Sequence, residues 1–405
     1  MTASITTPEA PSTPKVARRT FGELLTTDLR AMPVLVGLAA LWIFFSYQSD
    51  VFLTSRNLSN LLLQSTVVGI MALGLMFVLL VKEIDLSIAA INGVTAVLMA
   101  KLIVEFGLSP WLAIPLCIMV GALIGSFSAR WVSFVGVPSF VVTLGLGLAL
   151  NGIQLLLLPQ TARYGLMGTG VENIAQTYIT GLWSWALVAI GIAIYALLIF
   201  SNIKRRKQVG LPVALLTSAV LPLVGSALLG ALCVYIFNQY NGIPLPVLIF
   251  VVLLGLGGYI LKETQFGLSL YAIGNNDEAA RRAGIKVPAI RMYAFAIAGG
   301  VAAIAGVIAA SRTLGVGVFS GGGVGGGTLL LESIAAAVIG GVSLFGGRGA
   351  IYAALLGALV IGTVQNGLNL MGVENEIRLI VTGILLIFAV SIDKLIEKFT
   401  GQKSF

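Results

Sequence analysis

The sequence predicts an all-α fold, a polytopic membrane helix bundle of about 12 (10–12) transmembrane helices with both termini on the cytoplasmic side. Hydrophobic residues make up 58% of the 405 positions and charged residues only 10%, against roughly 25% charged residues in soluble domains. Uncharged stretches of about 20 residues or more recur along the chain, which is the length that spans a bilayer. Lys and Arg are concentrated in alternate loops, which fixes the predicted orientation.

The spans follow from these stretches and from the breaks between them. The longest uncharged stretch, between Lys207 and Lys262, has 54 residues and as one helix would measure roughly 80 Å. The Asn, Gly and Pro residues between Asn238 and Pro244 disfavour a continuous helix, so this stretch holds two spans. The twelve expected spans cover residues 32–48, 61–81, 88–106, 110–129, 138–158, 181–201, 211–237, 246–261, 289–311, 329–346, 350–371 and 378–392.

Three regions are expected: a cytoplasmic N-terminal tail (1–30), a transmembrane domain (31–393) with a cytoplasmic loop at 262–290, and a cytoplasmic C-terminal tail (394–405). The first region is rich in Thr, Pro and Arg and lacks an A-x-A-like cleavage site, so we interpret it as a tail and not as a secretory signal. With both termini inside, 19 of the 24 Lys and Arg residues are cytoplasmic. This asymmetry and membrane lipid account for the net charge of +8, so no nucleic acid partner is expected.

Composition also limits the chemistry. The chain has no histidine, and its two cysteines, Cys117 and Cys233, lie within spans, so a metal site, His-based acid–base catalysis and a disulfide framework are not expected. The glycine-rich runs at 321–327 and 340–349 lack the Lys-Ser or Lys-Thr of a phosphate-binding loop. We therefore expect no catalytic residue, no cofactor and no ATP hydrolysis in this chain.

The loop at 262–290 carries the signals of a short, exposed helix. Asn276 or Asp277 can cap the start of this helix, and Gly284 can close it. The negative charge of Glu278 suits the positive N-terminal end of the helix dipole, and the positive charge of Arg281 suits the negative C-terminal end. Such a helix has too few apolar residues to span a membrane and too much order for a linker. It is predicted to be held by a partner protein, with a solvated loop helix as the alternative.

Polar residues within or beside the spans form another group. Asn, Gln, Ser and Thr side chains can form hydrogen bonds with a neutral polyol that replace its hydrogen bonds to water. The same side chains also join helices in any membrane bundle. Glu83 and Asp85 adjoin a span end, where an interfacial turn is the alternative to a functional role. The group comprises Glu83, Asp85, Ser87, Asn92, Ser139, Thr143, Asn151, Gln154, Glu332, Gln365, Asn366 and Asn369.

Four motifs resemble the permease subunits of bacterial carbohydrate ABC importers, the family that contains the ribose and xylose permeases. They are E-I-D-L-S at 83–87, V-P-S-F-V-V-T-L at 137–144, Y-A-I-G-N-N-D-E-A-A-R at 271–281 with G-I at 284–285, and the series I-A-A at 334–336, G-G-V-S-L at 340–344 and N-G at 366–367. Lys82 and Ala89 replace glycines that the family usually carries around the first motif. The two spans between 181 and 237 and the N-x-Y-x-G-x-P-x-P pattern at 238–246 resemble the xylose permeases.

The resemblance implies a subunit that translocates a monosaccharide, most closely D-xylose, by alternating access in the bacterial cytoplasmic membrane. It implies three partners: a second copy of the chain, a cytoplasmic ABC ATPase that holds ATP and Mg, and an extracytoplasmic sugar-binding protein. The loop residues that would couple to the ATPase are Tyr271, Gly274, Asn275, Asn276, Asp277, Glu278, Ala279, Ala280, Arg281 and Gly284. Glu83, Asp85 and Ser87 are predicted to form an inner gate or clamp, and Ser139, Thr143, Asn151, Asn366 and Asn369 to line the sugar path.

Three alternatives are open at this point. The importer could carry ribose, galactose or another small sugar, because selectivity in such systems lies largely in the delivering protein. A secondary transporter driven by protons or sodium would be expected to carry an ionisable group in mid-membrane, whereas Lys101 and Glu332 lie near span ends. An intramembrane enzyme is disfavoured because the chain lacks histidine and a convincing pair of acids.

Overall fold

A computed structural model describes residues 31–211, 213–322 and 328–400. The N-terminal tail (1–30), the end of the C-terminal tail (401–405) and most of the glycine run (323–327) lie outside the described residues. The long helices are α2 (Ala31–Gln48), α3 (Ser55–Leu80), α4 (Ile88–Val104), α5 (Pro110–Val135), α6 (Ser139–Leu157), α8 (Leu182–Gln208), α9 (Leu221–Asn238), α10 (Leu245–Glu263), α13 (Val287–Thr313), α14 (Thr328–Ile339), α15 (Tyr352–Leu370) and α16 (Asn375–Thr400).

Short elements connect these helices. They are α7 (Asn173–Gln176), α11 (Gln265–Asn275), α12 (Asp277–Arg282), the π-helical turn η1 (Leu216–Val220), the 3-10 turn η2 (Ser320–Gly322) and the strands β1 (Arg163–Gly165), β2 (Tyr178–Ile179), β3 (Ile243–Pro244) and β4 (Gly315–Gly317). β1 pairs with β4 and β2 pairs with β3, both antiparallel.

The all-α membrane fold is confirmed. Within the described residues, eight helices are long and apolar enough to cross a membrane, and three shorter apolar helices accompany them. Each of the twelve expected spans overlaps one long helix. The exact number of membrane crossings stays a prediction.

Several boundaries differ from the expected ones: α3 begins at Ser55, α5 ends at Val135 and α8 ends at Gln208, each beyond its expected span. The span expected at 329–346 ends as a helix at Ile339, because Gly340 packs against the carbonyl of Ala353 and Gly341 takes a left-handed conformation with φ of 107°. A Cβ atom at position 340 would lie 1.9 Å from that carbonyl oxygen. At the other end of the chain, α16 continues to Thr400, into the region expected to be a tail.

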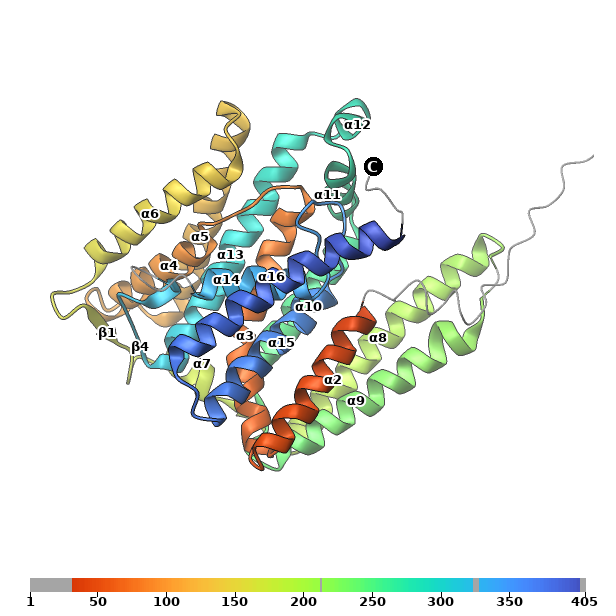
Figure 1. The fold of residues 1–405 in the computed structure, drawn as a ribbon, viewed down its shortest axis with the longest axis horizontal. Coiled ribbons are helices and arrows are strands. Elements are labelled where there is room, and N and C mark those ends of the chain that lie inside the picture. Colours follow the sequence, from red (N-terminus) through yellow and green to blue (C-terminus); the bar gives the residue numbers. More distant parts are fainter. Residues whose placement is uncertain (1–30, 212, 323–327, 401–405) are drawn as a thin grey trace, which may run out of the picture.

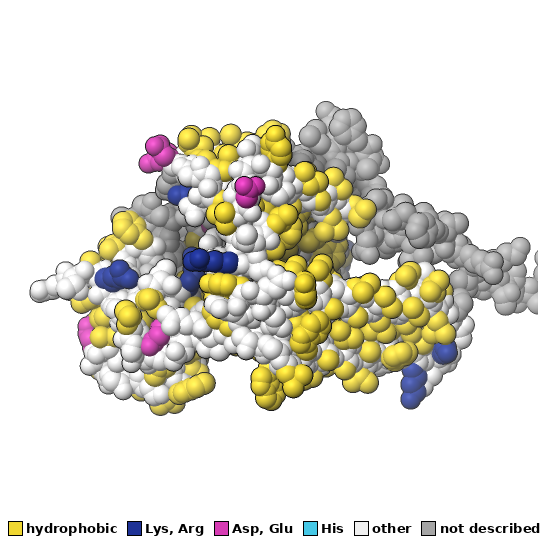
Figure 2. All heavy atoms as spheres, turned by 90° about the horizontal axis from the view of Figure 1, so that it is seen from below, with side chains coloured by type: hydrophobic (Ala, Val, Ile, Leu, Met, Phe, Trp, Pro, Cys, Tyr) yellow, Lys and Arg dark blue, Asp and Glu magenta, His cyan; other side chains and the backbone are white. Residues whose placement is uncertain are grey.

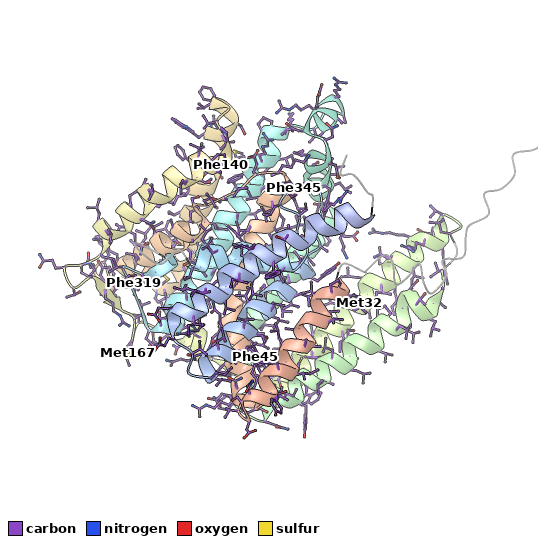
Figure 3. All side chains as sticks on the ribbon, viewed as in Figure 1. Met32, Phe45, Phe140, Met167, Phe319 and Phe345 are labelled. Carbon is purple, nitrogen blue, oxygen red and sulfur yellow. The ribbon has the colours of Figure 1, made fainter. Side chains whose placement is uncertain are left out.

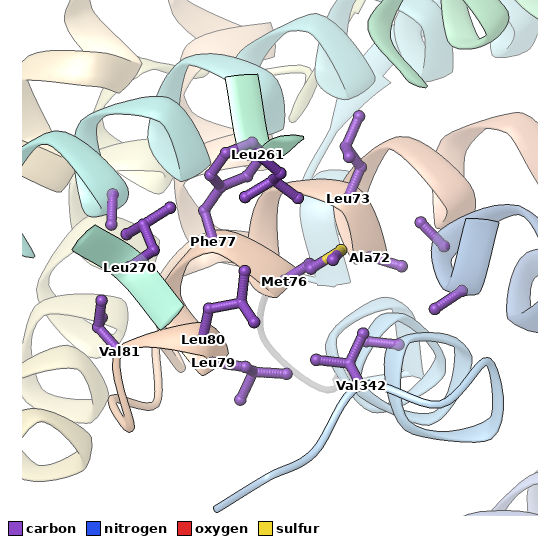
Figure 4. Packing of buried hydrophobic residues seen from close by; sticks show 14 of the residues in the cluster. Ala72, Leu73, Met76, Phe77, Leu79, Leu80, Val81, Leu261, Leu270 and Val342 are labelled. Atoms are coloured by element: carbon purple, nitrogen blue, oxygen red, sulfur yellow. The ribbon is translucent and has the colours of Figure 1, made fainter. Parts of the chain in front are cut away.

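α3 and α13 form the centre of the bundle. In their most apolar 18-residue windows, 89% of α3 and 78% of α13 are buried. Figure 4 shows Phe77 and Leu80 of α3 packed with Leu261, Leu270 and Val342 from three other segments. Close packing depends on small residues: Gly121 of α5 faces the carbonyl of Gly299 on α13, with room for no Cβ atom on either side.

The bundle has two distinct ends (Figure 1). α12, the 81–87 loop and the 340–351 segment meet at one end, where the Gly347 N–H donates to the Leu80 carbonyl at 3.0 Å. β1, β4 and α7 lie at the opposite end. In Figure 3, Phe140 and Phe345 lie toward the first end, and Phe319 and Met167 lie toward the second.

The helix pair α8/α9 stands apart from this centre. It lies at one edge of the molecule, on the far side from α4, α5 and α6 (Figure 1). Only 6% of the most apolar window of α8 and 11% of that of α9 with η1 are buried. Figure 2 shows hydrophobic side chains over much of one face of the molecule, with few charged groups among them. Such a surface fits contact with lipid.

Candidate functional site

The short helix expected in the 262–290 loop is confirmed as α12. The Asn276 Oδ1 atom accepts a hydrogen bond from the Ala279 N–H at 3.0 Å, which caps the helix start. Gly284 closes it with φ of 86°. Two ion pairs lie along its surface, Arg281 with Asp277 and Arg282 with Glu278, and the partners in each pair are one helical turn apart.

α12 presents a buried side and an open side. Ala280 is buried against the body, whereas Glu278 and Arg282 keep 74% and 78% of their side-chain surface exposed. The open side is therefore available to a partner. Substitutions that remove the charge of Glu278 or Arg282 would leave the packing of Ala280 intact.

α11, a helix that was not predicted from the sequence, attaches α12 to the body. The Tyr271 hydroxyl donates to the Gly349 carbonyl at 2.8 Å. Gly274 packs directly on the Leu80 carbonyl, where a Cβ atom would lie 1.9 Å from the oxygen. The Asn275 side chain donates to the Tyr271 carbonyl at 2.9 Å and so stays within its own helix. The pattern at 271–275 thus holds α12 in place through backbone contacts.

Arg291 at the start of α13 connects α12 to the loop that precedes α4. Its Nε atom lies 3.0 Å from Glu83 Oε1, and its Nη2 atom lies 3.6 Å from Asp277 Oδ2. Arg291 and Glu83 keep only 18% and 11% of their side-chain surface exposed, so solvent screens this pair less than the pairs on α12. Glu83 is therefore linked to α12 through one guanidinium.

The 81–87 loop is also tied to the first turns of α6. The Ser139 hydroxyl accepts from the Ile84 N–H at 3.1 Å, and the Thr143 hydroxyl accepts from the Leu86 N–H at 3.0 Å. These contacts bring the first two motifs together. The same contacts occupy both hydroxyls, which favours a structural role for two of the residues predicted to line the sugar path.

Asp85 forms a closed turn at the start of α4. One of its carboxylate oxygens accepts from both the N–H (2.9 Å) and the hydroxyl (2.6 Å) of Ser87, and the side chain is fully buried. Burial raises the pKa of Asp85 above its usual 3.8, and the hydrogen bonds from Ser87 oppose that rise. The arrangement is a clamp on the turn that joins α3 to α4.

The remaining predicted path residues lie apart from one another. Asn366 exchanges two amide hydrogen bonds with Asn57 of α3, at 2.9 and 3.0 Å, in a buried pair. Asn369 is exposed and accepts from Arg378 at 3.3 Å. Asn151 on α6 has a buried amide oxygen without a hydrogen-bond partner among the described residues. These side chains do not converge on a single cavity.

A cavity of about 560 Å³ lies instead between α4, α13, β1, β4, η2 and the start of α14. Its polar lining includes Asn92, Arg163, Thr313 and Ser320. Gln154 borders this region and donates to the carbonyls of Gly317 and Ser320, both at 3.1 Å.

Asn92 and Gln154 are among the polar residues predicted to lie within spans, but neither was predicted to line the sugar path. Their isolation among apolar neighbours was the available signal. Phe319, which is exposed, marks the β4 side of this cavity in Figure 3.

An apolar bundle with a largely apolar cavity that carries a few polar side chains at one end, and an exposed, anchored helix at the other, fits the class of membrane transport proteins. Residues 57–390 match the family described as branched-chain amino acid transport system / permease component. The chain therefore belongs to this family of ABC transporter permeases, whose members span the inner membrane several times and are not themselves enzymes.

Its similar relatives include sugar permeases. The chain is 34% identical over 305 residues to the xylose transport system permease protein XylH of Escherichia coli K12, which covers 75% of this chain and 77% of that protein. It is 36% identical over 303 residues to XylH of Haemophilus influenzae, an alignment that covers 74% of this chain and 80% of that protein. The D-allose transport system permease protein AlsC of Escherichia coli K12 is 28% identical over 67% of this chain and 64% of its own length. No solved structure matches the chain.

Proposed function

We propose that this chain translocates D-xylose as the permease subunit of an ABC importer, by alternating access between an outward-open and an inward-open state. Identity of 34–36% to xylose permeases over about three quarters of the chain supports the sugar. Ribose and galactose are the alternative cargoes. The family argues against an ion-coupled secondary transporter.

The single observation that carries the coupling mechanism is α12, an exposed helix joined to the body by a half-buried arginine. We assign the residues of α11 and α12 between Tyr271 and Gly284 to the ATPase contact. When the ATPase subunits close on ATP, movement of α12 would reach Glu83 through Arg291, at 3.6 and 3.0 Å. Because Ser139 and Thr143 bind the same loop, the movement would then reach α6. Glu83, Asp85 and Ser87 would act as the inner clamp in this sequence of contacts.

The cavity beside Asn92 is the proposed sugar path in this chain. A neutral sugar needs hydrogen-bond partners in place of water, and Asn92, Thr313, Arg163 and Ser320 can supply donors and acceptors there. Asn92 is the most buried of the four and donates to the Ala302 carbonyl at 3.1 Å. Its carbonyl oxygen would face the sugar.

The proposed assembly follows the family. It contains two copies of this chain, a cytoplasmic ATPase that binds ATP and Mg, and an extracytoplasmic sugar-binding protein. We place α12 and both termini in the cytoplasm and count twelve membrane crossings, because this arrangement leaves most Lys and Arg residues inside. The domain limits 31–393 and the coupling loop 262–290 are part of the same proposal.

The test is uptake of radiolabelled xylose into proteoliposomes that hold this chain, its ATPase and its binding protein. ATP-dependent uptake that excess xylose blocks and excess ribose and galactose leave unchanged is the expected result. Uptake that follows an imposed ion gradient without ATP would contradict the importer, and stronger competition by ribose would reassign the sugar. Asn92→Ala should raise the KM for uptake, whereas Thr143→Val should leave KM unchanged.

A further inference from the structure

The pair α8/α9 carries a second cavity that the transport mechanism does not use. It has a volume of about 490 Å³ and lies between the last turns of α8, η1 and the end of α10. Pockets that hold small ligands measure roughly 300–1,000 Å³, so this one can hold a polar headgroup. Because α10 leads into α11, the cavity lies at the same end of the bundle as α12.

The lining is cationic and rich in hydrogen-bond donors. Arg205 and Arg206 come from α8, together with Asn202 one turn earlier, and Ser218 comes from η1. Residues three and four apart share a helix face, so the amide and the two guanidiniums converge. Glu263 of α10 supplies one carboxylate, 3.6 Å from Arg205.

Charge complementarity indicates an anion. The basic run from Lys204 to Lys207 places four cations beside a single carboxylate, and an arginine fork matches the geometry of phosphate oxygens. The Arg205–Glu263 pair is exposed, with 69% and 36% of the two side chains accessible. A ligand can therefore compete for Arg205 at small cost.

The surface next to this cavity is apolar. Leu197, Leu198 and Phe200 of α8, just before the arginines, keep 70%, 50% and 55% of their surface exposed. Acyl chains could lie along these side chains while a phosphate enters the cavity. Anionic lipids attract basic pockets between membrane helices in this way.

We propose that the cavity binds one anionic phospholipid, with its phosphodiester on Arg205 and Arg206 and its polar headgroup near Asn202 and Ser218. The lipid would fill the space between α8 and α10 at the end where Arg205 and Glu263 connect them. At the opposite end the helix pair is already attached to the body, because the Ser55 hydroxyl of α3 donates to the side-chain oxygen of Gln239, next to the end of α9, at 3.2 Å. The site would thus hold the free end of α8/α9 against the body.

The test is native mass spectrometry of the purified full chain, exchanged into micelles that contain phosphatidylglycerol or phosphatidylcholine. The chain should retain phosphatidylglycerol, and Arg205→Gln with Arg206→Gln should reduce that retention at least tenfold. Lys204→Gln with Lys207→Gln is the matched control, because it removes the same charge from the same helix outside the cavity lining. It should keep more than half of the bound lipid.

Three results would overturn the proposal. Equal loss in both double variants would indicate general attraction of a basic surface. Equal retention of phosphatidylcholine would remove the requirement for negative charge. Displacement of the lipid by millimolar inorganic phosphate would make this a site for free phosphate. The readout is binding in the absence of ATPase and sugar, so its outcome is independent of the transport function proposed above.

Discussion

Apolar composition is similar in the central helices α3 and α13 and in the outer pair α8/α9. The two regions differ in how much of their surface other helices cover. Most of the apolar window is buried in the central helices and very little in the outer pair. Glycines show the difference most directly: those of the centre, such as Gly299, touch neighbouring backbone, whereas Gly191 and Gly225 of the outer pair have no atom within 4 Å of their missing Cβ.

This comparison teaches that hydrophobicity in a membrane chain marks a span but does not say what the span faces. Lipid is as apolar as leucine, so the hydrophobic effect does not choose which helix becomes central. Small residues that permit close backbone approach make that choice. Substitutions should therefore have large effects in the centre and small effects in the outer pair.

The largest contrast is expected for Gly357→Ala in α15, which packs against the central helix α3 and against α14, compared with Gly191→Ala in α8. A Cβ atom at 357 would lie 1.7 Å from the Ala336 carbonyl oxygen, whereas the space at 191 is open. Overpacking costs about 1–3 kcal/mol or more, so Gly357→Ala should lower the apparent Tm in detergent by at least about 3 °C. Gly191→Ala should leave it unchanged or raise it, because Ala favours helix. Equal Tm values in a fluorescence-detected melt would contradict the packing difference.

A smaller contrast is expected between two amide contacts. Asn366→Leu leaves the buried side-chain oxygen of Asn57 without its partner, which costs about 1–3 kcal/mol, while Asn57 still donates to the Phe52 carbonyl at 2.8 Å. The double variant Asn57→Leu with Asn366→Leu should recover part of that loss, since no amide is then left unpaired. Asn238→Leu in the outer pair should cost less, because its contact with Ser184 is only partly buried. Thermal melts of the three variants and the original chain check the order, and a larger loss for Asn238→Leu would break the comparison.

The next effect is a pH dependence of the stability, which arises from the buried Asp85 in the turn between α3 and α4. Since burial raises the pKa of Asp85 above 3.8 in the folded chain, unfolding releases a proton at intermediate pH. The buried, protonated Asp85 therefore makes its full contribution to stability below about pH 3.8, the usual pKa of the unfolded chain. This contribution is lost as the pH rises through the higher pKa of the folded chain. Asp85→Asn should flatten this part of the Tm–pH curve while keeping an oxygen that accepts from Ser87. Lys204→Gln in the outer pair serves as control and should leave the curve unchanged.

The smallest effect concerns backbone strain. Lys82 has φ of 62°, a left-handed conformation that costs roughly 1–2 kcal/mol for residues other than glycine. Its ammonium group donates to the Asn275 carbonyl at 3.3 Å, which offsets part of that cost. Lys82→Gly should raise the apparent Tm slightly, and Gly210→Ala in the loop that follows α8, at φ of 72°, should lower it slightly. A destabilising Lys82→Gly would show that the Asn275 contact is worth more than the strain.

Local signals explain how much of the fold was predictable. The cap at Asn276, the charge order of α12 and Gly284 are neighbours in sequence, so their helix could be predicted in full. α11 was missed although Thr264 caps it through the Gly267 N–H at 3.1 Å. The glycine run that begins at Gly340 is a local signal of close packing or broken helix after Ile339, whereas its contact with Ala353 is not visible in the sequence.

The candidate site was less predictable because its contacts join distant residues. Glu83 and Arg291 are far apart in sequence but meet at one end of the bundle, and the Ile84 N–H donates to Ser139, 55 positions away. A hydroxyl in an apolar span is compatible with both sugar binding and helix packing, so sequence alone does not decide between the two roles for Ser139. Asn92 reaches the cavity through the packing of α4 against α13, which only the folded chain displays.

The most direct test of the central claim, that α12 couples the body to an ATPase, is ATP-driven xylose uptake by Glu278→Arg in reconstituted proteoliposomes. Glu278 is exposed and its only ion pair among the described residues is with Arg282, so folding and apparent Tm should match the original chain. Uptake should fall at least tenfold together with sugar-stimulated ATP hydrolysis, while Lys286→Glu, an exposed charge reversal outside α12, should retain most of it. Undiminished uptake by Glu278→Arg would contradict coupling through this helix.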